Sequence, residues 1–276
     1  MKAGLPLPGG PPGSSAYKSW LSTVTSELPT LHSAAPDNTF ADNWYSKSVS
    51  YPTWAGYEDY QNSYGMIQGQ WDMANVSSSL AQGQGISQWV GIGGDENNDG
   101  GFASLVQSGG EIFNYQSNGS TVANMFVEML SDYNTTPINW CFASGYGSIA
   151  PGNNLWGEEE FKGTVDFNGT SYDQYNAIAN DVTNSQTTNW QTVDCPSNYV
   201  NNSAEAVLED PANGAVTLPY FSSTADFWNI YTYPPGGEVN GEVAPYILMN
   251  LRNGNGSNAT PTGWTSETSF GVNYGT

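Results

Sequence analysis

Histidine, basic residues and cysteine are all scarce in this chain of 276 residues, which has one histidine, five Lys or Arg residues and two cysteines. A single imidazole cannot supply a histidine-rich zinc site. His32 also lies in an atypical N-terminal segment, where a Ser–His–Asp triad is not expected. Cys141 and Cys195 suffice for one disulfide, but not for a metal site or a cysteine-stapled scaffold.

The chain has 26 acidic residues against its five basic ones, which gives a formal net charge of −21 at pH 7. Nucleic acids and anionic membranes would repel such a chain, so neither is expected as a partner. Free carboxyl groups titrate near pH ~4, so the net charge falls toward zero in acid. We therefore expect an extracellular, secreted protein in an acidic environment, with a merely acidic or halotolerant extracellular protein as the alternative.

Long apolar runs are also missing, and no stretch of about 18 apolar residues predicts a membrane span. Residues 1–43 are expected to be an N-terminal extension, partly disordered or the remnant of a pro-segment, with a short helical pattern over residues 17–28. Seven Asn-x-Ser/Thr sequons weakly support secretion. They begin at Asn75, Asn118, Asn134, Asn168, Asn201, Asn255 and Asn258.

From about residue 44 the chain consists of short aromatic and β-branched runs separated by Gly, Asn and Pro. This spacing predicts one all-β domain over residues 44–276, an antiparallel sandwich or barrel. Residues around 150–200 are polar and are expected to form a long irregular insertion between strands. Its acidic run, Glu158 to Glu160, is expected to be solvated.

Several catalytic motifs are absent as well, including H-E-x-x-H, G-x-S-x-G and the Asp-Thr/Ser-Gly pair of aspartic peptidases. The segment "GIGGDENNDGG" lacks the Lys and the helix of a phosphate-binding loop. Its Asp95, Asn97 and Asp99 have the spacing of the first ligands of a calcium loop, but no bidentate acid follows, so we interpret it as a turn. No metal or other cofactor is expected. Catalysis by carboxyl and amide groups, or no catalysis, remains.

Two strand-like segments carry such groups. In "AEAVLEDP", alternation places Glu205, Val207 and Glu209 on one face of a strand. In "SLVQSGG", it places Leu105 and Gln107 together. Taken alone, Gln107 is best interpreted as a core amide bonded to a neighbouring backbone.

Together with their surroundings, these segments resemble the eqolisin family of glutamic peptidases. The matching fragments occur in order and are "QWVGIGG", "LVQSGG", "MFVEML", "AEAVLEDP" and "LPYFSSTADF". "TWAGY" is similar to the family's mature N-terminus, and "TSFGVNY" is similar to its last strand. The resemblance covers about residue 44 to the C-terminus. It implies a β-sandwich of two packed sheets, of concanavalin-like or jelly-roll type, and an acid-acting endopeptidase with polypeptide substrates, expected to be a monomer.

The resemblance also implies site residues. Gln107 and Glu209 match the family's catalytic dyad, whereas Glu205 is expected to be an ordinary strand acid. The matching or neighbouring substrate-binding positions are Trp54, Trp89, Asn124, Phe126 and Glu128. The chain departs from the family at Gly93, where Asp is common, and in the Asn124–Leu130 strand pattern. These departures leave the dyad intact but alter its surroundings and the expected substrate preference.

These residue types suit peptide hydrolysis in acid. Glu209 can move a proton between water and the leaving amine, and Gln107 can stabilise the oxyanion or hold the water without carrying a charge. Two alternatives stay open at the level of sequence. One is a non-catalytic sandwich that binds glycans through exposed aromatic residues, and the other is a glycosidase that uses Glu128 and Glu209 as its two carboxyl groups.

Overall fold

The structure is a computed structural model. It describes residues 45–51, 53–60, 64–77, 79–94, 105–114, 121–130, 140–167, 169–196, 203–211, 217–233, 246–252, 258–266 and 268–275. The N-terminal extension with its helical pattern and the turn over residues 95–99 lie outside these ranges. No helix in the described ranges is long and apolar enough to cross a membrane.

Every regular element within the described ranges is a β-strand, as the run spacing predicts. The strands are β1 (Tyr45–Tyr51), β2 (Trp54–Tyr60), β3 (Met66–Asp72), β4 (Gly85–Gly93), β5 (Leu105–Phe113), β6 (Val122–Leu130), β7 (Trp140–Tyr146), β8 (Asn154–Phe167), β9 (Thr170–Asp181), β10 (Gln186–Thr187), β11 (Gln191–Pro196), β12 (Ser203–Glu209), β13 (Ala225–Tyr233), β14 (Tyr246–Arg252), β15 (Asn258–Pro261) and β16 (Phe270–Tyr274).

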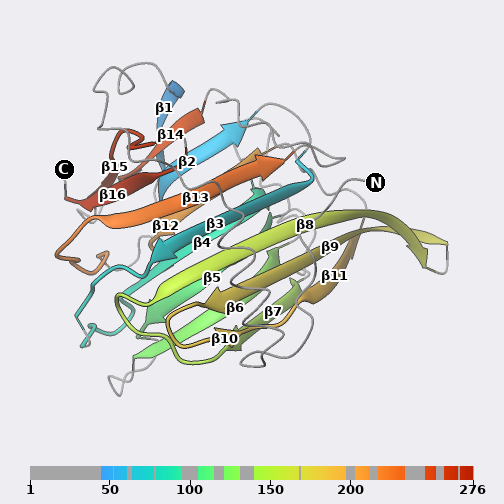
Figure 1. Ribbon diagram of the computed structural model, residues 1–276, viewed down its shortest axis with the longest axis horizontal. Coiled ribbons are helices and arrows are strands. Elements are labelled where there is room, and N and C mark those ends of the chain that lie inside the picture. Colours follow the sequence, from blue (N-terminus) through green and yellow to red (C-terminus); the bar gives the residue numbers. More distant parts are fainter. Residues whose placement is uncertain are drawn as a thin grey trace.

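The strands form two packed layers (Figure 1). The first layer contains β9, β8, β3 and β13, and the second contains β2, β12, β4, β5, β6 and β7. The strands β16, β15 and β14 continue the hydrogen-bonded path from one layer to the other. All described pairings are antiparallel except that of β1 with β14. The predicted antiparallel β-sandwich is therefore confirmed.

The hydrophobic core fills the space between the layers. Trp71 and Phe227 of the first layer and Val90 and Met125 of the second are at most 1% exposed. Burying side chains of this size contributes about 1.5–3 kcal/mol each. Glycine lets the layers approach closely, since a Cβ on Gly157 would lie 2.6 Å from the Ser108 hydroxyl of the facing layer.

The polar segment over residues 150–200 is not the irregular insertion that its composition suggests. It contains β8 and β9, the two longest strands, and β8 pairs with β3 on one side and with β9 on the other. The core-facing positions of these strands include Gly157, Glu159, Ala177 and Ala179, which are small or acidic rather than large and apolar. The alternation of apolar and polar residues that predicts a strand is therefore weak in this segment.

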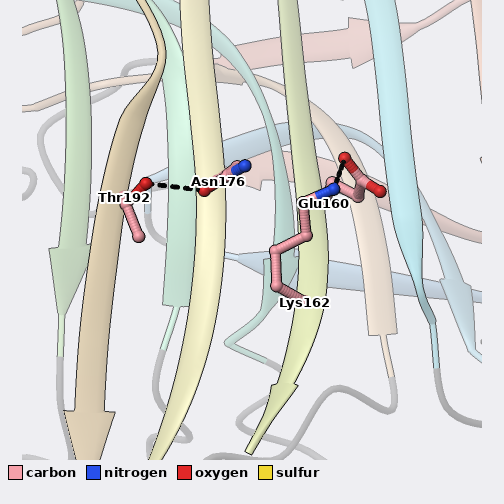
Figure 2. A network of polar contacts seen from close by, with 4 residues as sticks. All are labelled: Glu160, Lys162, Asn176 and Thr192. Carbon is pink, nitrogen blue, oxygen red and sulfur yellow. Dashed lines mark hydrogen bonds and ion pairs between the residues drawn. The ribbon is translucent and has the colours of Figure 1, made fainter. Parts of the chain in front are cut away.

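The acidic run on β8 is also less solvated than expected. Glu159 is 0% exposed and lies in the core beside Ser108, and Glu158 is 8% exposed on the outer surface of the first layer. Only Glu160 is substantially exposed, and it forms an ion pair with Lys162 (Figure 2). The same view shows the Thr192 hydroxyl donating to Asn176 at 2.8 Å, which links β11 to β9. The run is solvated at one position of three.

The two cysteines lie on strands that approach each other. Cys141 is in β7 and Cys195 is in β11, and these two strands are in contact. Their side chains lie outside the described part of the structure, so the disulfide stays a prediction.

Candidate active site

The candidate site lies on the outer surface of the second layer, which we call the site face. Strand pairing arranges its residues in three rows. From β12 through β4 and β5 to β6, the rows are Glu205–Gly91–Gln107–Glu128, Val207–Trp89–Gly109–Phe126 and Glu209–Ser87–Glu111–Asn124. Every other residue of each strand points to this face, so the predicted site residues of four strands share one surface.

An apolar cluster forms the floor of the site face. It consists of Trp54, Trp89, Leu105 and Val207, with Phe126 packed against it. The rings of Trp54 and Trp89 meet edge to face, with centroids 5.1 Å apart. Both indoles are buried, at 8% and 0% exposed. Of the predicted substrate-binding residues, these two therefore lie mainly beneath the surface that a substrate would touch.

Glycine makes room for Trp89. A Cβ on Gly109 would lie 2.5 Å from Cβ of Trp89 and 2.3 Å from the backbone oxygen of Gln88. Gly93, where the family often has Asp, has a φ of 86°, a backbone conformation that favours glycine. The "GIGG" and "QSGG" glycines thus shape the site through the backbone.

Glu209 is held by indole donors. The Trp89 Nε1–H donates to Glu209 Oε2 at 2.7 Å, and Trp54 is a second hydrogen-bond partner. Glu209 is partly exposed, whereas every other residue of β12 is buried. Burial raises the pKa of Glu209 to about 7, helped by the charges of Asp210 and Glu111 and opposed by the two indoles. This carboxyl group therefore stays protonated through the acidic range.

Gln107 and Glu128 form a second polar unit. Gln107 Nε2 donates a hydrogen bond to Glu128 Oε2 at 2.5 Å. Because a carboxyl oxygen accepts hydrogen bonds, the amide of Gln107 turns its nitrogen toward Glu128. Gln107 is 5% exposed, and its Oε1 makes no hydrogen bond. Burial raises the pKa of Glu128 to about 7, with contributions from the charges of Glu209 and Glu111, while the bond from Gln107 opposes the rise. The site thus contains one unused amide acceptor beside two protonatable carboxyl groups.

The two predicted catalytic residues share the site face without touching. The same-row neighbour of Gln107 on β12 is Glu205, with Gly91 between them, and the row of Trp89 and Gly109 separates Gln107 from Glu209. Glu205 is 1% exposed, so Glu209 is the accessible acid of β12. The charge of Glu209 nevertheless raises the pKa of Glu128, the partner of Gln107. The site face therefore couples the two polar units electrostatically.

Glu111 is a site-face acid that sequence reasoning missed. It lies in the row of Glu209, with Ser87 between them, and its charge raises the pKa of both Glu209 and Glu128. The sequence feature that could have identified Glu111 is its position four residues after Gln107, which places both side chains on the same face of the strand.

Asn124 ends the same row at β6. The amide nitrogen of Asn124, in its flipped orientation, donates to the carbonyl oxygens of Ala123 at 3.1 Å and Gly147 at 3.2 Å. Its amide nitrogen is thus engaged by backbone. Across the described ranges, no group of three or more His, Cys, Asp or Glu side chains is arranged to hold a metal ion.

The sandwich and its family match place the chain among the peptidases. More particularly, it belongs to the Peptidase A4 family, whose model matches residues 52–274. No curated protein matches it in sequence.

Solved structures of eqolisin peptidases have the same fold. Scytalido-glutamic peptidase with a peptide-based transition-state analogue is 16% identical with a TM-score of 0.57, and the match covers 81% of this chain and 98% of that one. SCP-B, in complex with the tripeptide Ala-Ile-His, is 15% identical with a TM-score of 0.54 and the same coverage.

Proposed function

We propose that the chain is a secreted, acid-acting endopeptidase in which Glu209 and Gln107 hydrolyse the peptide bond. The observation that carries this proposal is the asymmetry of β12. Glu209 is partly exposed and bonded to two indoles, whereas Glu205 is buried. On the same face, Gln107 has a buried amide oxygen that makes no hydrogen bond.

The pKa of Glu209 decides the order of proton transfers. With a pKa of about 7, the ionised fraction at pH 4 is on the order of 10⁻³. An enzyme that used Glu209 first as a base would therefore lose activity about tenfold per pH unit in acid. Action in acid requires Glu209 to donate first, to the substrate carbonyl oxygen, and then to take a proton from the attacking water. The same carboxyl group later protonates the leaving nitrogen as the C–N bond breaks, and it takes back a proton from a hydroxyl group of the collapsing diol, so that it ends protonated as it began.

Gln107 positions the water. Its Oε1 accepts a hydrogen bond from the water, and its Nε2 is anchored on Glu128. The second Nε2–H is then a donor to the same substrate oxygen that Glu209 protonates, and an amide keeps this donor at every pH because it carries no titratable charge.

The proposed substrates are polypeptides. Related structures hold a peptide-based transition-state analogue and a tripeptide, and this chain shares their fold. A net charge of −21 at pH 7 falls toward zero in acid, which fits the extracellular acidic environment that we propose.

The test is digestion of a denatured protein at about pH 3–4. We expect Glu209→Gln to lower kcat by about 10³-fold or more and Gln107→Ala by about 10²–10³-fold, with folding intact. Glu160→Gln, in the other layer, is the matched control and should retain full activity. Full activity in Glu209→Gln would refute the proposal. Hydrolysis of polysaccharides but not proteins would favour the two-carboxyl glycosidase.

A further inference from the structure

A groove of about 520 Å³ lies away from the site-face rows, between the β3–β4 connection and the segment that precedes β13. Its two walls are held together by the bridge between Val76 and Phe221 and by Gln84 Nε2, which donates to the Thr217 carbonyl oxygen at 3.1 Å. Val76 and Leu80, which are 4% and 6% exposed, supply an apolar floor. The groove is thus a depression whose two walls are joined by hydrogen bonds.

One wall of the groove presents an aromatic ring to solvent. Tyr220 is 65% exposed, and its ring meets Tyr274 edge to face with centroids 5.3 Å apart. This contact supports one edge of the Tyr220 side chain while leaving much of it open. Exposed aromatic rings that are held in place bind apolar surfaces at a low cost in side-chain entropy.

The remaining lining restricts the chemistry of a ligand. The rim consists of amide and hydroxyl groups from Asn75, Ser77, Ser79 and Ser222. No charged side chain from the described residues lines the groove, in a chain with 26 acidic residues. Without a carboxyl group or a cation, the groove offers nothing specific to ions, nucleotides or peptide termini. An aromatic ring with neutral donors and acceptors fits a neutral saccharide, which has both apolar C–H faces and hydroxyl groups.

A sequon lies at the edge of this groove. Asn75, Val76 and Ser77 form an Asn-x-Ser sequence, and Asn75 and Ser77 are exposed. The other described sequon, at Asn258, lies in β15, and its Thr260 hydroxyl accepts a hydrogen bond from Arg252 at 2.7 Å. A glycan attached at Asn75 would start at the rim, directly beside the aromatic wall.

We infer that the groove is a neutral-saccharide site and that its occupant is the first part of an N-linked glycan carried by Asn75. Attachment transfers the oligosaccharide from a lipid diphosphate. The bond between the anomeric carbon and the diphosphate breaks, a bond to Asn75 Nδ2 forms, and one amide proton is released. The first two sugars, a chitobiose unit, then pack on Tyr220. A free saccharide has the same chemistry, so the test has one arm for each source.

The first arm uses the full chain secreted from yeast. Peptide mass spectrometry should find a glycan on Asn75 that is absent in Asn75→Gln. In the folded protein, endoglycosidase should release this glycan about 2- to 10-fold faster from Tyr220→Ala than from the wild type, because the aromatic contact is lost. Tyr172→Ala, on β9, is the matched control and should leave the rate unchanged.

The second arm uses the full chain made in bacteria, which carries no N-linked glycan. Saturation-transfer NMR with free N,N′-diacetylchitobiose should give a signal that Tyr220→Ala abolishes and Tyr172→Ala retains. A signal in this arm alone would overturn the Asn75 glycan as the occupant and assign the groove to free saccharides. An unmodified Asn75 together with no chitobiose signal would overturn the inference, as would a Tyr220→Ala variant that matches the wild type in both arms.

Discussion

Glu209 differs from Glu205 in what surrounds it. The two acids lie four residues apart on one face of β12, but only Glu209 is partly exposed and is bonded to Trp89. The indole N–H stabilises the charged form and so opposes the rise in pKa that burial causes. Trp89 is 0% exposed, so it reaches this carboxyl group from within the apolar cluster and not from solvent.

Trp89→Phe tests that role. Removing the Nε1–H donor should raise the pKa of Glu209 above about 7 and move the alkaline limb of the kcat/KM profile to higher pH. The smaller ring should also lower thermal stability. An unchanged limb in a folded variant would mean that the indole does not act on the ionisation of Glu209.

Glu111→Gln should shift the same limb in the opposite direction. The charge of Glu111 raises the pKa of Glu209 and Glu128, so removing it should lower both and move the alkaline limb to lower pH. High salt should shrink the shift if the interaction crosses solvent. A shift to higher pH would contradict the electrostatic coupling on the site face.

At the scale of the element, β5 carries two adjacent glycines with different surroundings. A Cβ on Gly109 would meet the backbone of β4 and Cβ of Trp89, at 2.3 and 2.5 Å. A Cβ on Gly110 would meet the ends of the Leu155 and Ile149 side chains, at 2.4 and 2.8 Å. Side-chain ends can move, whereas a paired strand cannot.

Gly109→Ala should therefore destabilise the fold by about 2–3 kcal/mol and reduce activity, because it displaces Trp89 from Glu209. Gly110→Ala points into the core and should cost less while leaving kcat near the wild-type value. Denaturant unfolding and peptidase assays on both variants check this. Equal effects of the two substitutions would contradict the assigned role of Gly109.

Individual strands also show how far the sequence could predict the structure. The site-face strands were readable because β12 places Glu205 and Glu209 on one face and Ala204, Ala206 and Leu208 on the other, and because the resemblance supplied Gln107 and Glu209. The strands β8 and β9 were missed because their core-facing positions include Glu159, Ala177 and Ala179, which carry little hydrophobic signal. The hydrogen bond from Trp89 to Glu209 could not be predicted, since it depends on pairing register and on the glycines that admit the ring.

Buried carboxyl groups in both layers make the folded protein more stable in acid than at neutral pH. Burial raises the pKa of Glu158 to about 8 and that of Glu159 well above its ordinary value. Burial also raises the pKa of Asp59. Hydrogen bonds from Tyr64 and Thr232 oppose this rise. In the unfolded chain these groups ionise near pH ~4–4.5. Their contribution to stability is therefore complete below that pH and is lost as the pH rises, for Glu158 through its raised pKa of about 8.

Thermal unfolding across pH 3–8 should show this loss directly, with a Tm that falls from about pH 4.5 upward. Glu159→Gln, which keeps the shape of a neutral acid, should recover part of the loss at pH 7 and change little at pH 3. Asp166→Asn, exposed on the same strand, should not reproduce this pattern. A Tm that rises between pH 4.5 and 7 would contradict the role of the buried acids.

The role of Glu209 as the catalytic acid is tested most directly by comparing the two acids of β12. We would measure kcat/KM for a peptide substrate from pH 2 to 8 with the wild type, Glu209→Gln and Glu205→Gln, each checked for folding by its thermal transition. We expect wild-type activity in acid that falls above about pH 7, a loss of about 10³-fold or more in Glu209→Gln at every pH, and much smaller changes in Glu205→Gln. A folded Glu209→Gln variant with near wild-type activity, or a larger loss in a folded Glu205→Gln variant, would contradict that role.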